Sequence, residues 1–174
     1  MRAFLLTTAL AMSLAACTPP ASTDGRPETP PAVQACNSVQ PDLTRLVSVE
    51  QEVATATSAA DLRGGVITPG VYDLTRAVRI ARATGWHGER AVALSISEEP
   101  NGPLTVNWAA AAPSGEVDTW TASFTDVAQQ GQLSYSCGRS GEVLAGFATS
   151  GNTLQLRIPD GANGALQLDF QRRP

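Results

Sequence analysis

The sequence has no lysine, a single histidine and few aromatic residues. All twelve basic residues are therefore arginines, and they are scattered along the chain rather than clustered. A protein that binds nucleic acid usually carries a basic patch, so we expect no nucleic-acid partner. The net charge of −4 mainly favours solubility. A single histidine, His87, supplies too few ligands for a typical zinc site. We therefore expect neither a metal nor a cofactor.

Patterns typical of catalytic sites are also missing. The chain has no Gly-x-Ser-x-Gly elbow, no phosphate-binding loop and no Cys-x-x-Cys pair. Two adjacent carboxylates, Glu98 and Glu99, lie at the end of a predicted strand, where neighbouring side chains point to opposite faces. Such a pair is poorly placed for joint acid and base catalysis. We interpret His87 as an ordinary loop residue and expect that the protein is not an enzyme.

Long apolar runs are absent except at the N-terminus, where an uncharged stretch follows Arg2 and ends in small residues. Its length of about 14 residues is less than the roughly 20 that a transmembrane helix needs. This arrangement predicts a signal peptide over residues 1–16. The segment Leu14-Ala15-Ala16-Cys17 resembles the lipobox of bacterial lipoproteins. The resemblance implies that acyl chains such as palmitate on Cys17 anchor the protein in a membrane.

Thr18 stands where an aspartate would retain an enterobacterial lipoprotein in the inner membrane, so the same resemblance implies delivery to the outer membrane. The alternative is an ordinary cleaved signal peptide with an incidental Cys17. Residues 18–35 contain five prolines and few apolar side chains. Such a composition cannot form a packed core, so residues 17–35 are predicted to be the lipidated cysteine and a disordered tether.

Two further cysteines, Cys36 and Cys137, remain after export to an oxidising compartment. A disulfide between them is the default expectation there, and two buried free thiols are the alternative. The bond would close a loop of about 100 residues and stabilise the fold by roughly 4–5 kcal/mol. Residues 36–174 are therefore predicted to form a single, disulfide-closed β domain.

The hydrophobic pattern changes along this domain. Pro41-Asp42 suits the start of a helix, and apolar residues such as Leu43 and Leu46 follow near one helical face. We therefore predict a short helix over residues 42–56. From Gly64 onward the apolar residues alternate with polar ones, as in half-buried strands, and Gly or Pro residues separate the runs.

These alternating runs predict about eight strands, the first of which is long and interrupted at Arg76. The runs lie at residues 72–80, 92–96, 104–108, 119–124, 133–137, 143–149, 154–158 and 166–170. No helical crossover separates them, which argues against a parallel sheet. Short links between sequential strands favour an all-β, antiparallel, up-and-down barrel, and a β-sandwich is the alternative.

The residues Gly70-Val71-Tyr72 at the start of the first strand are similar to the Gly-x-Trp signature of lipocalins and related calycin barrels. The longer run 64–75 also resembles the opening of lipocalin-like domains in bacterial lipoproteins. The resemblance implies an eight-stranded barrel with a closed end near Tyr72, and it specifies no ligand.

Aromatic residues at inward strand positions are the candidates for core packing or for the lining of a pocket. They are Tyr72, Trp108, Trp120, Phe124 and Tyr135. An eight-stranded barrel holds either side chains or one small ligand. Our hypothesis is a non-enzymatic envelope barrel that binds an apolar small ligand. The alternative is a module that binds an envelope protein or resembles a protease inhibitor.

Overall fold

A computed structural model describes residues 35–52, 62–100 and 102–174 of the chain. The predicted signal peptide, Cys17 and the tether up to residue 34 lie outside these ranges. The described residues form nine strands. They are β1 (Val47–Glu52), β2 (Gly70–Ala81), β3 (Glu89–Glu98), β4 (Leu104–Ala111), β5 (Val117–Val127), β6 (Gln130–Cys137), β7 (Glu142–Ser150), β8 (Thr153–Pro159) and β9 (Gly164–Arg172).

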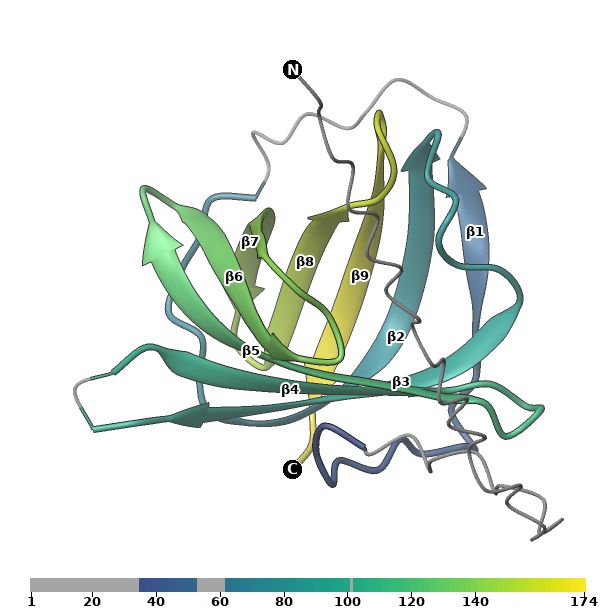
Figure 1. The fold of residues 1–174 in the computed structure, drawn as a ribbon, viewed down its shortest axis with the longest axis horizontal. Coiled ribbons are helices and arrows are strands. Elements are labelled where there is room, and N and C mark those ends of the chain that lie inside the picture. Colours follow the sequence, from purple (N-terminus) through teal and green to yellow (C-terminus); the bar gives the residue numbers. More distant parts are fainter. Residues whose placement is uncertain (1–34, 53–61, 101) are drawn as a thin grey trace, which may run out of the picture. The chain divides into compact units, whose positions relative to one another are not determined.

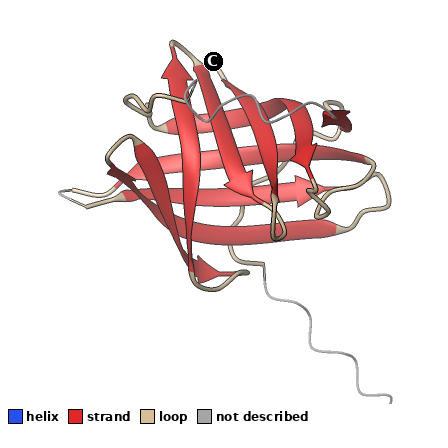
Figure 2. Ribbon diagram, turned by 90° about the horizontal axis from the view of Figure 1, so that it is seen from above, coloured by secondary structure: helices blue, strands red, loops and turns tan. Residues whose placement is uncertain are grey.

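Strands β2 to β9 follow one another around a single antiparallel sheet, and β9 pairs with β2 to close the ring (Figure 1). The closing pair runs from Tyr72 opposite Arg172 to Ala81 opposite Gly164. These eight strands are the eight that the alternating pattern predicted, and the all-β barrel is confirmed over the sandwich. The described chain contains strands and loops without a helix, and so no helix able to cross a membrane (Figure 2).

The predicted helix over residues 42–56 is wrong where the structure describes it. Residues 47–52 form β1, and residues 53–56 lie outside the described ranges. Strand β1 fills a gap in the wall, because β2 and β3 pair only over the first residues of β2. It runs parallel to the second half of β2 and antiparallel to the start of β3. The expectation of purely antiparallel pairing is therefore wrong for β1. Parallel pairing of β1 with β2 is possible because a long segment of chain connects the two strands.

A β-bulge lies in β2 between Leu74 and Arg76, at the interruption that the sequence showed. The extra residue reverses which side chains face inward along the rest of the strand. Ala77 therefore belongs to the core and pairs with Leu168 of β9. Val78 and Ile80, which share the sequence parity of Tyr72, are buried outside that core cluster.

A second bulge lies between β5 and β6, where Ala122 pairs with Tyr135 but Thr121 pairs with Cys137. Ser136 is the extra residue, so Cys137 does not continue the inward set that the sequence pattern assigned to it. Cys137 instead shares the outer face with Thr121. It forms a disulfide with Cys36 there, with a Cα–Cα distance of 5.6 Å, and the predicted bond is thereby confirmed.

Residues 35–46, which we call the strap, cross the outer surface of the barrel after this disulfide. The Asn37 side-chain amide donates hydrogen bonds to the backbone oxygens of Trp108 and Trp120, at 3.0 and 2.9 Å. Further along, the buried carboxylate of Asp73 accepts two hydrogen bonds from the Arg173 guanidinium, at 2.6 and 2.9 Å. Arg45 of the strap adds a contact of 3.4 Å to the same carboxylate.

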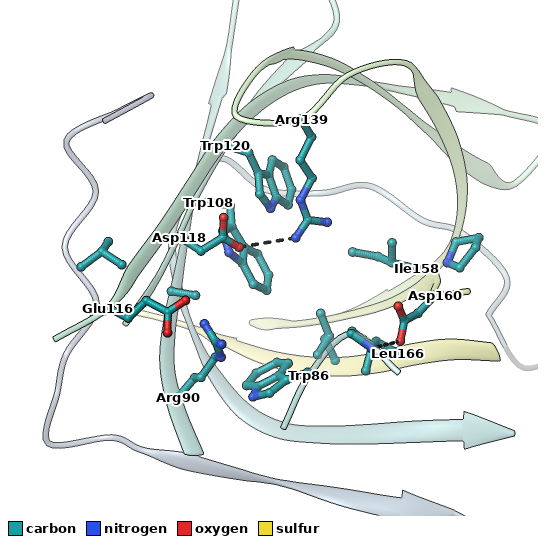
Figure 3. Close-up of a pocket in the computed structure, with 15 residues that line it drawn as sticks. Trp86, Arg90, Trp108, Glu116, Asp118, Trp120, Arg139, Ile158, Asp160 and Leu166 are labelled. Carbon is teal, nitrogen blue, oxygen red and sulfur yellow. Dashed lines mark hydrogen bonds and ion pairs between the residues drawn. The ribbon is translucent and has the colours of Figure 1, made fainter. Parts of the chain in front are cut away.

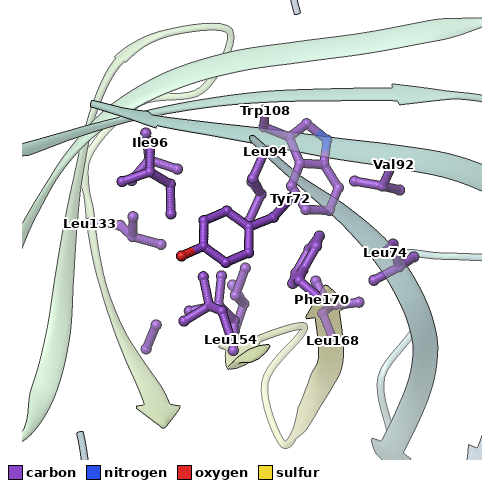
Figure 4. Packing of buried hydrophobic residues seen from close by; sticks show 14 of the residues in the cluster. Tyr72, Leu74, Val92, Leu94, Ile96, Trp108, Leu133, Leu154, Leu168 and Phe170 are labelled. Atoms are coloured by element: carbon purple, nitrogen blue, oxygen red, sulfur yellow. The ribbon is translucent and has the colours of Figure 1, made fainter. Parts of the chain in front are cut away.

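Apolar side chains fill the barrel interior, with Tyr72, Leu94, Leu154 and Phe170 packed together (Figure 4). At the end of the barrel near Tyr72, which we call the closed end, Ile67 belongs to the core cluster and the Thr68 backbone oxygen accepts a hydrogen bond from the Tyr72 hydroxyl at 2.6 Å. The Gly64 backbone N–H, earlier in the same segment, donates to the Phe147 oxygen at 2.8 Å. The resemblance to lipocalins stays a prediction.

Candidate functional site

A partly open pocket of about 370 Å³ lies at the opposite end of the barrel, which we call the open end. The connections β2–β3, β4–β5, β6–β7 and β8–β9 surround it, and the packed core forms its floor (Figure 3). Leu166 and Leu168 of β9, Ile158 of β8 and Ala110 of β4 supply apolar walls. The volume falls in the range of small-molecule sites.

The three tryptophans of the chain all line this pocket. Trp86 comes from the loop between β2 and β3, whereas Trp108 and Trp120 lie directly opposite each other on β4 and β5. The rings of Trp108 and Trp120 are nearly parallel, with centroids 5.3 Å apart and an interplanar angle of 9°. Each of the three side chains is buried. The site is therefore walled by flat aromatic surfaces.

The indole N–H groups distinguish this pocket from the rest of the core. The Nε1 atoms of Trp86, Trp108 and Trp120 are buried, and none has a hydrogen-bond acceptor among the described residues. A buried donor without an acceptor costs about 1–3 kcal/mol, and buried indoles usually find a partner. Three such donors therefore belong to side chains of one pocket, although their nitrogens have no surface open to it.

Charged side chains form the rim. Arg139, from the loop after β6, forms an ion pair of 3.4 Å with Asp118 of β5, and both side chains are exposed by more than 40%. Such an exposed pair stabilises the fold little. The Arg139 guanidinium also lies 5.6 Å from the ring centroid of Trp120 and 5.9 Å from that of Tyr135. Arg139 therefore covers one side of the aromatic cluster without being firmly held.

The other rim groups have different roles. The Asp160 carboxylate accepts hydrogen bonds from the backbone N–H groups of Thr84 and Gly85, at 2.6 and 2.7 Å, and so it fixes the loop that carries Trp86. Arg90 at the start of β3 is half-buried and lines the pocket. In the described part of the chain Arg90 has no ion-pair partner, and the Glu116 side chain on the rim likewise has none.

The shifted pKa values belong to groups away from this pocket. Burial raises the pKa of the Tyr72 phenol at the closed end. The hydrogen bonds with Asp73 raise the pKa of Arg173 beside the strap. Hydrogen bonds from Thr44 lower the pKa of the Asp42 carboxyl.

The five aromatic candidates from the sequence divide between the two ends. Trp108 and Trp120 line the pocket, and the half-buried Tyr135 meets Trp120 edge to face with centroids 5.2 Å apart. Tyr72 and Phe124 are buried in the core instead. Phe124 contacts Phe147, whose side chain is fully buried.

Sequence reasoning missed three residues that complete the site, namely Trp86 and Arg139 in loops and Arg90 at the start of β3. The only available signal was Trp86 itself, a large apolar side chain in an otherwise polar loop. Neither arginine stands out in the sequence, because the position of each depends on loops that meet only in the folded barrel.

The residues considered for catalysis are not brought together. His87 is exposed, and its Nδ1 atom lies 2.9 Å from Nη1 of Arg79. Glu98 and Glu99 are exposed at the far end of β3 from the pocket. Within the described ranges, histidine, cysteine and acidic residues form no cluster of three or more that could hold a metal ion.

Comparison with known proteins adds little. No family model and no curated protein matches the chain. Among solved structures, a de novo designed fluorescence-activating β-barrel is similar to it, with a TM-score of 0.43 and 11% sequence identity. The similarity covers 61% of this chain and 94% of the designed one.

Proposed function

We propose that the protein is a lipid-anchored envelope protein whose barrel binds an apolar small ligand at its open end. The observation that carries the binding role is the pocket lined by all three tryptophans, since the remainder of the barrel interior is filled. In this proposal the role is non-enzymatic, and the residues considered for catalysis, His87, Glu98 and Glu99, do not line the pocket. The membrane is the partner of the anchor.

The anchor rests on the residues Leu14 to Cys17 and on the proline-rich stretch that separates them from the strap. Several acyl chains bind a bilayer stably where a single chain does not. Cells labelled with radioactive palmitate should show the label in this polypeptide and lose it in a Cys17→Ser variant. Absence of label from the unaltered protein would overturn the anchor, and recovery of labelled protein with the inner membrane would overturn the outer-membrane assignment.

Ligand binding is supported by the difference between the pocket and the interior beneath it. Leu94, Leu154 and Phe170 are each at most 1% exposed, so the barrel has no continuous channel that could hold a ligand along its axis. The pocket therefore confines a ligand to the open end, where the shape of the space and the charged rim select it.

The binding experiment uses the full chain with Cys17→Ser and the neutral fluorescent probe N-phenylnaphthylamine. We expect the emission of the probe to rise on binding, with an affinity on the order of micromolar. Leu166→Trp, which fills the pocket, should weaken binding at least about tenfold. Leu144→Trp is the matched control, because Leu144 is 56% exposed on the outer surface. Equal effects of the two variants, or no binding at all, would contradict the proposed role.

A further inference from the structure

The buried polar groups of the pocket are neutral hydrogen-bond donors, whereas the rim carries charged side chains of both signs. The buried ones are the three indole N–H groups, and none has an acceptor among the described residues. The rim carboxylates are partly committed, because Asp118 pairs with Arg139 and Asp160 holds the backbone of residues 84 and 85. Because the indole nitrogens have no exposed surface, a ligand in the pocket meets the rings themselves and the charged groups of the rim.

The shape of the pocket favours a compact ring over a long chain. The parallel rings of Trp108 and Trp120 give one flat wall, and Trp86 lies on another side of the space (Figure 3). Below them the buried Phe170 contacts Trp108 edge to face, with centroids 6.2 Å apart, and blocks the way deeper into the barrel. An extended acyl chain would have to leave most of its length in solvent, whereas a planar ring fits between flat surfaces.

The charged side chains at the rim further narrow the chemical class of the ligand. Arg90 is half-buried, lines the pocket and has no ion-pair partner in the described ranges. Arg139 lines the same pocket from the other side, with only an exposed ion pair to Asp118 (Figure 3). Guanidinium groups bind carboxylates through two parallel hydrogen bonds, which are stronger than bonds between neutral groups. Glu116 on the same rim disfavours a second negative charge, so a single carboxylate is the best fit.

We propose that the pocket binds a compact aromatic carboxylate, whose ring packs against the tryptophans and whose oxygens accept hydrogen bonds from Arg90. This inference rests on the proposed small-ligand binding and names the ligand class for the same site. It predicts selectivity among molecules of equal shape that differ only in the polar group.

The test uses nuclear magnetic resonance of the ¹⁵N-labelled full chain with Cys17→Ser. Because all three tryptophans line the pocket, each indole N–H signal reports on the site. The probes are naphthoate, methylnaphthalene and naphthylmethylammonium, which share one ring system, and dodecanoate as the chain-like acid. We expect naphthoate to bind at least about tenfold more tightly than the other three and to shift at least two indole proton signals, because its ring packs against the tryptophans.

Two arginine variants locate the carboxylate. Arg90→Gln should weaken naphthoate binding about tenfold and leave methylnaphthalene binding unchanged. Arg82→Gln is the control, since Arg82 is exposed in the loop after β2 and does not line the pocket. Methylnaphthalene or dodecanoate binding as tightly as naphthoate would overturn the ligand class but leave the small-ligand role intact. Failure of all four probes while N-phenylnaphthylamine binds would do the same, and failure of that probe as well would overturn both.

Discussion

Both ends of the barrel contain buried aromatic side chains, but the two ends differ in how their buried polar atoms are hydrogen-bonded. At the closed end the Tyr72 hydroxyl donates to the backbone oxygen of Thr68 at 2.6 Å. At the open end the three indole N–H groups have no acceptor among the described residues. Since native proteins satisfy nearly all buried donors, the difference separates a part built for stability from a part suited to binding. The following predictions test that separation.

The largest expected effect concerns the disulfide between Cys36 and Cys137, which holds the strap against the open-end half of the barrel. Replacing both cysteines with alanine should reduce the free energy of unfolding by about 4–5 kcal/mol, because the bond closes a very long loop in the unfolded chain. Urea denaturation of the oxidised protein and the double variant measures the difference. A loss below about 1 kcal/mol would show that the strap's hydrogen bonds hold it without the bond.

A core truncation beneath the closed end should be nearly as costly. Phe147 is fully buried and meets Phe124 edge to face, with centroids 5.1 Å apart. Phe147→Ala should lower the free energy of unfolding by about 3–5 kcal/mol, through lost burial and a cavity. Leu144→Ala on the exposed face of the same strand should stay within about 0.5 kcal/mol. If the ends are as distinct as we infer, Phe147→Ala retains naphthoate binding at temperatures where it is folded.

The hydrogen bond of Tyr72 gives a smaller, pH-dependent effect. Burial raises the pKa of this phenol above its ordinary value of 10.0. The unfolded chain therefore loses the proton first as the pH rises. The contribution of Tyr72 is therefore fully present below pH 10 and is lost above it. Tyr72→Phe should cost about 1 kcal/mol at neutral pH and should be less sensitive to alkaline pH. Equal alkaline slopes for the two proteins would contradict this account.

The smallest expected effect is a gain in stability from a substitution in the β5–β6 turn, which lies beside Gly64. Ala128 and Gln129 both adopt positive φ, at 54° and 70°, where glycine is favoured. Gln129→Gly should raise the free energy of unfolding by up to about 1 kcal/mol, because it removes this backbone strain. Gln130→Gly, one residue into β6, is the matched control and should destabilise by about 0.5–1 kcal/mol. Thermal unfolding of both variants compares them.

Most of the barrel wall was predictable from the sequence because each strand buries one face. The alternating runs around Leu94, Trp108 and Leu156, for example, give β3, β4 and β8 directly. Strand β1 was not predictable in this way. Its short segment Val47–Glu52 follows apolar residues at helical spacing, and it becomes a strand only because β2 and β3 leave a gap that it fills.

The candidate site was predictable only in part. Trp108 and Trp120 lie on regular strands and could be assigned to the interior from parity alone. Trp86 and Arg139 lie on different loops, between β2 and β3 and between β6 and β7, and nothing local to either loop indicates that they face one pocket. Their meeting depends on the order in which the strands close the ring.

The amino-acid sequence by itself determined the all-β barrel, its eight alternating strands and the pairing of Cys36 with Cys137. Local alternation and composition suffice for these, since each strand buries its own apolar face. Only the tertiary structure decided which face each residue takes after a bulge. A one-residue shift turned Cys137 outward to reach Cys36, and another brought Ala77 into the core. Such shifts depend on the partner strand, because inward and outward positions alternate with every residue.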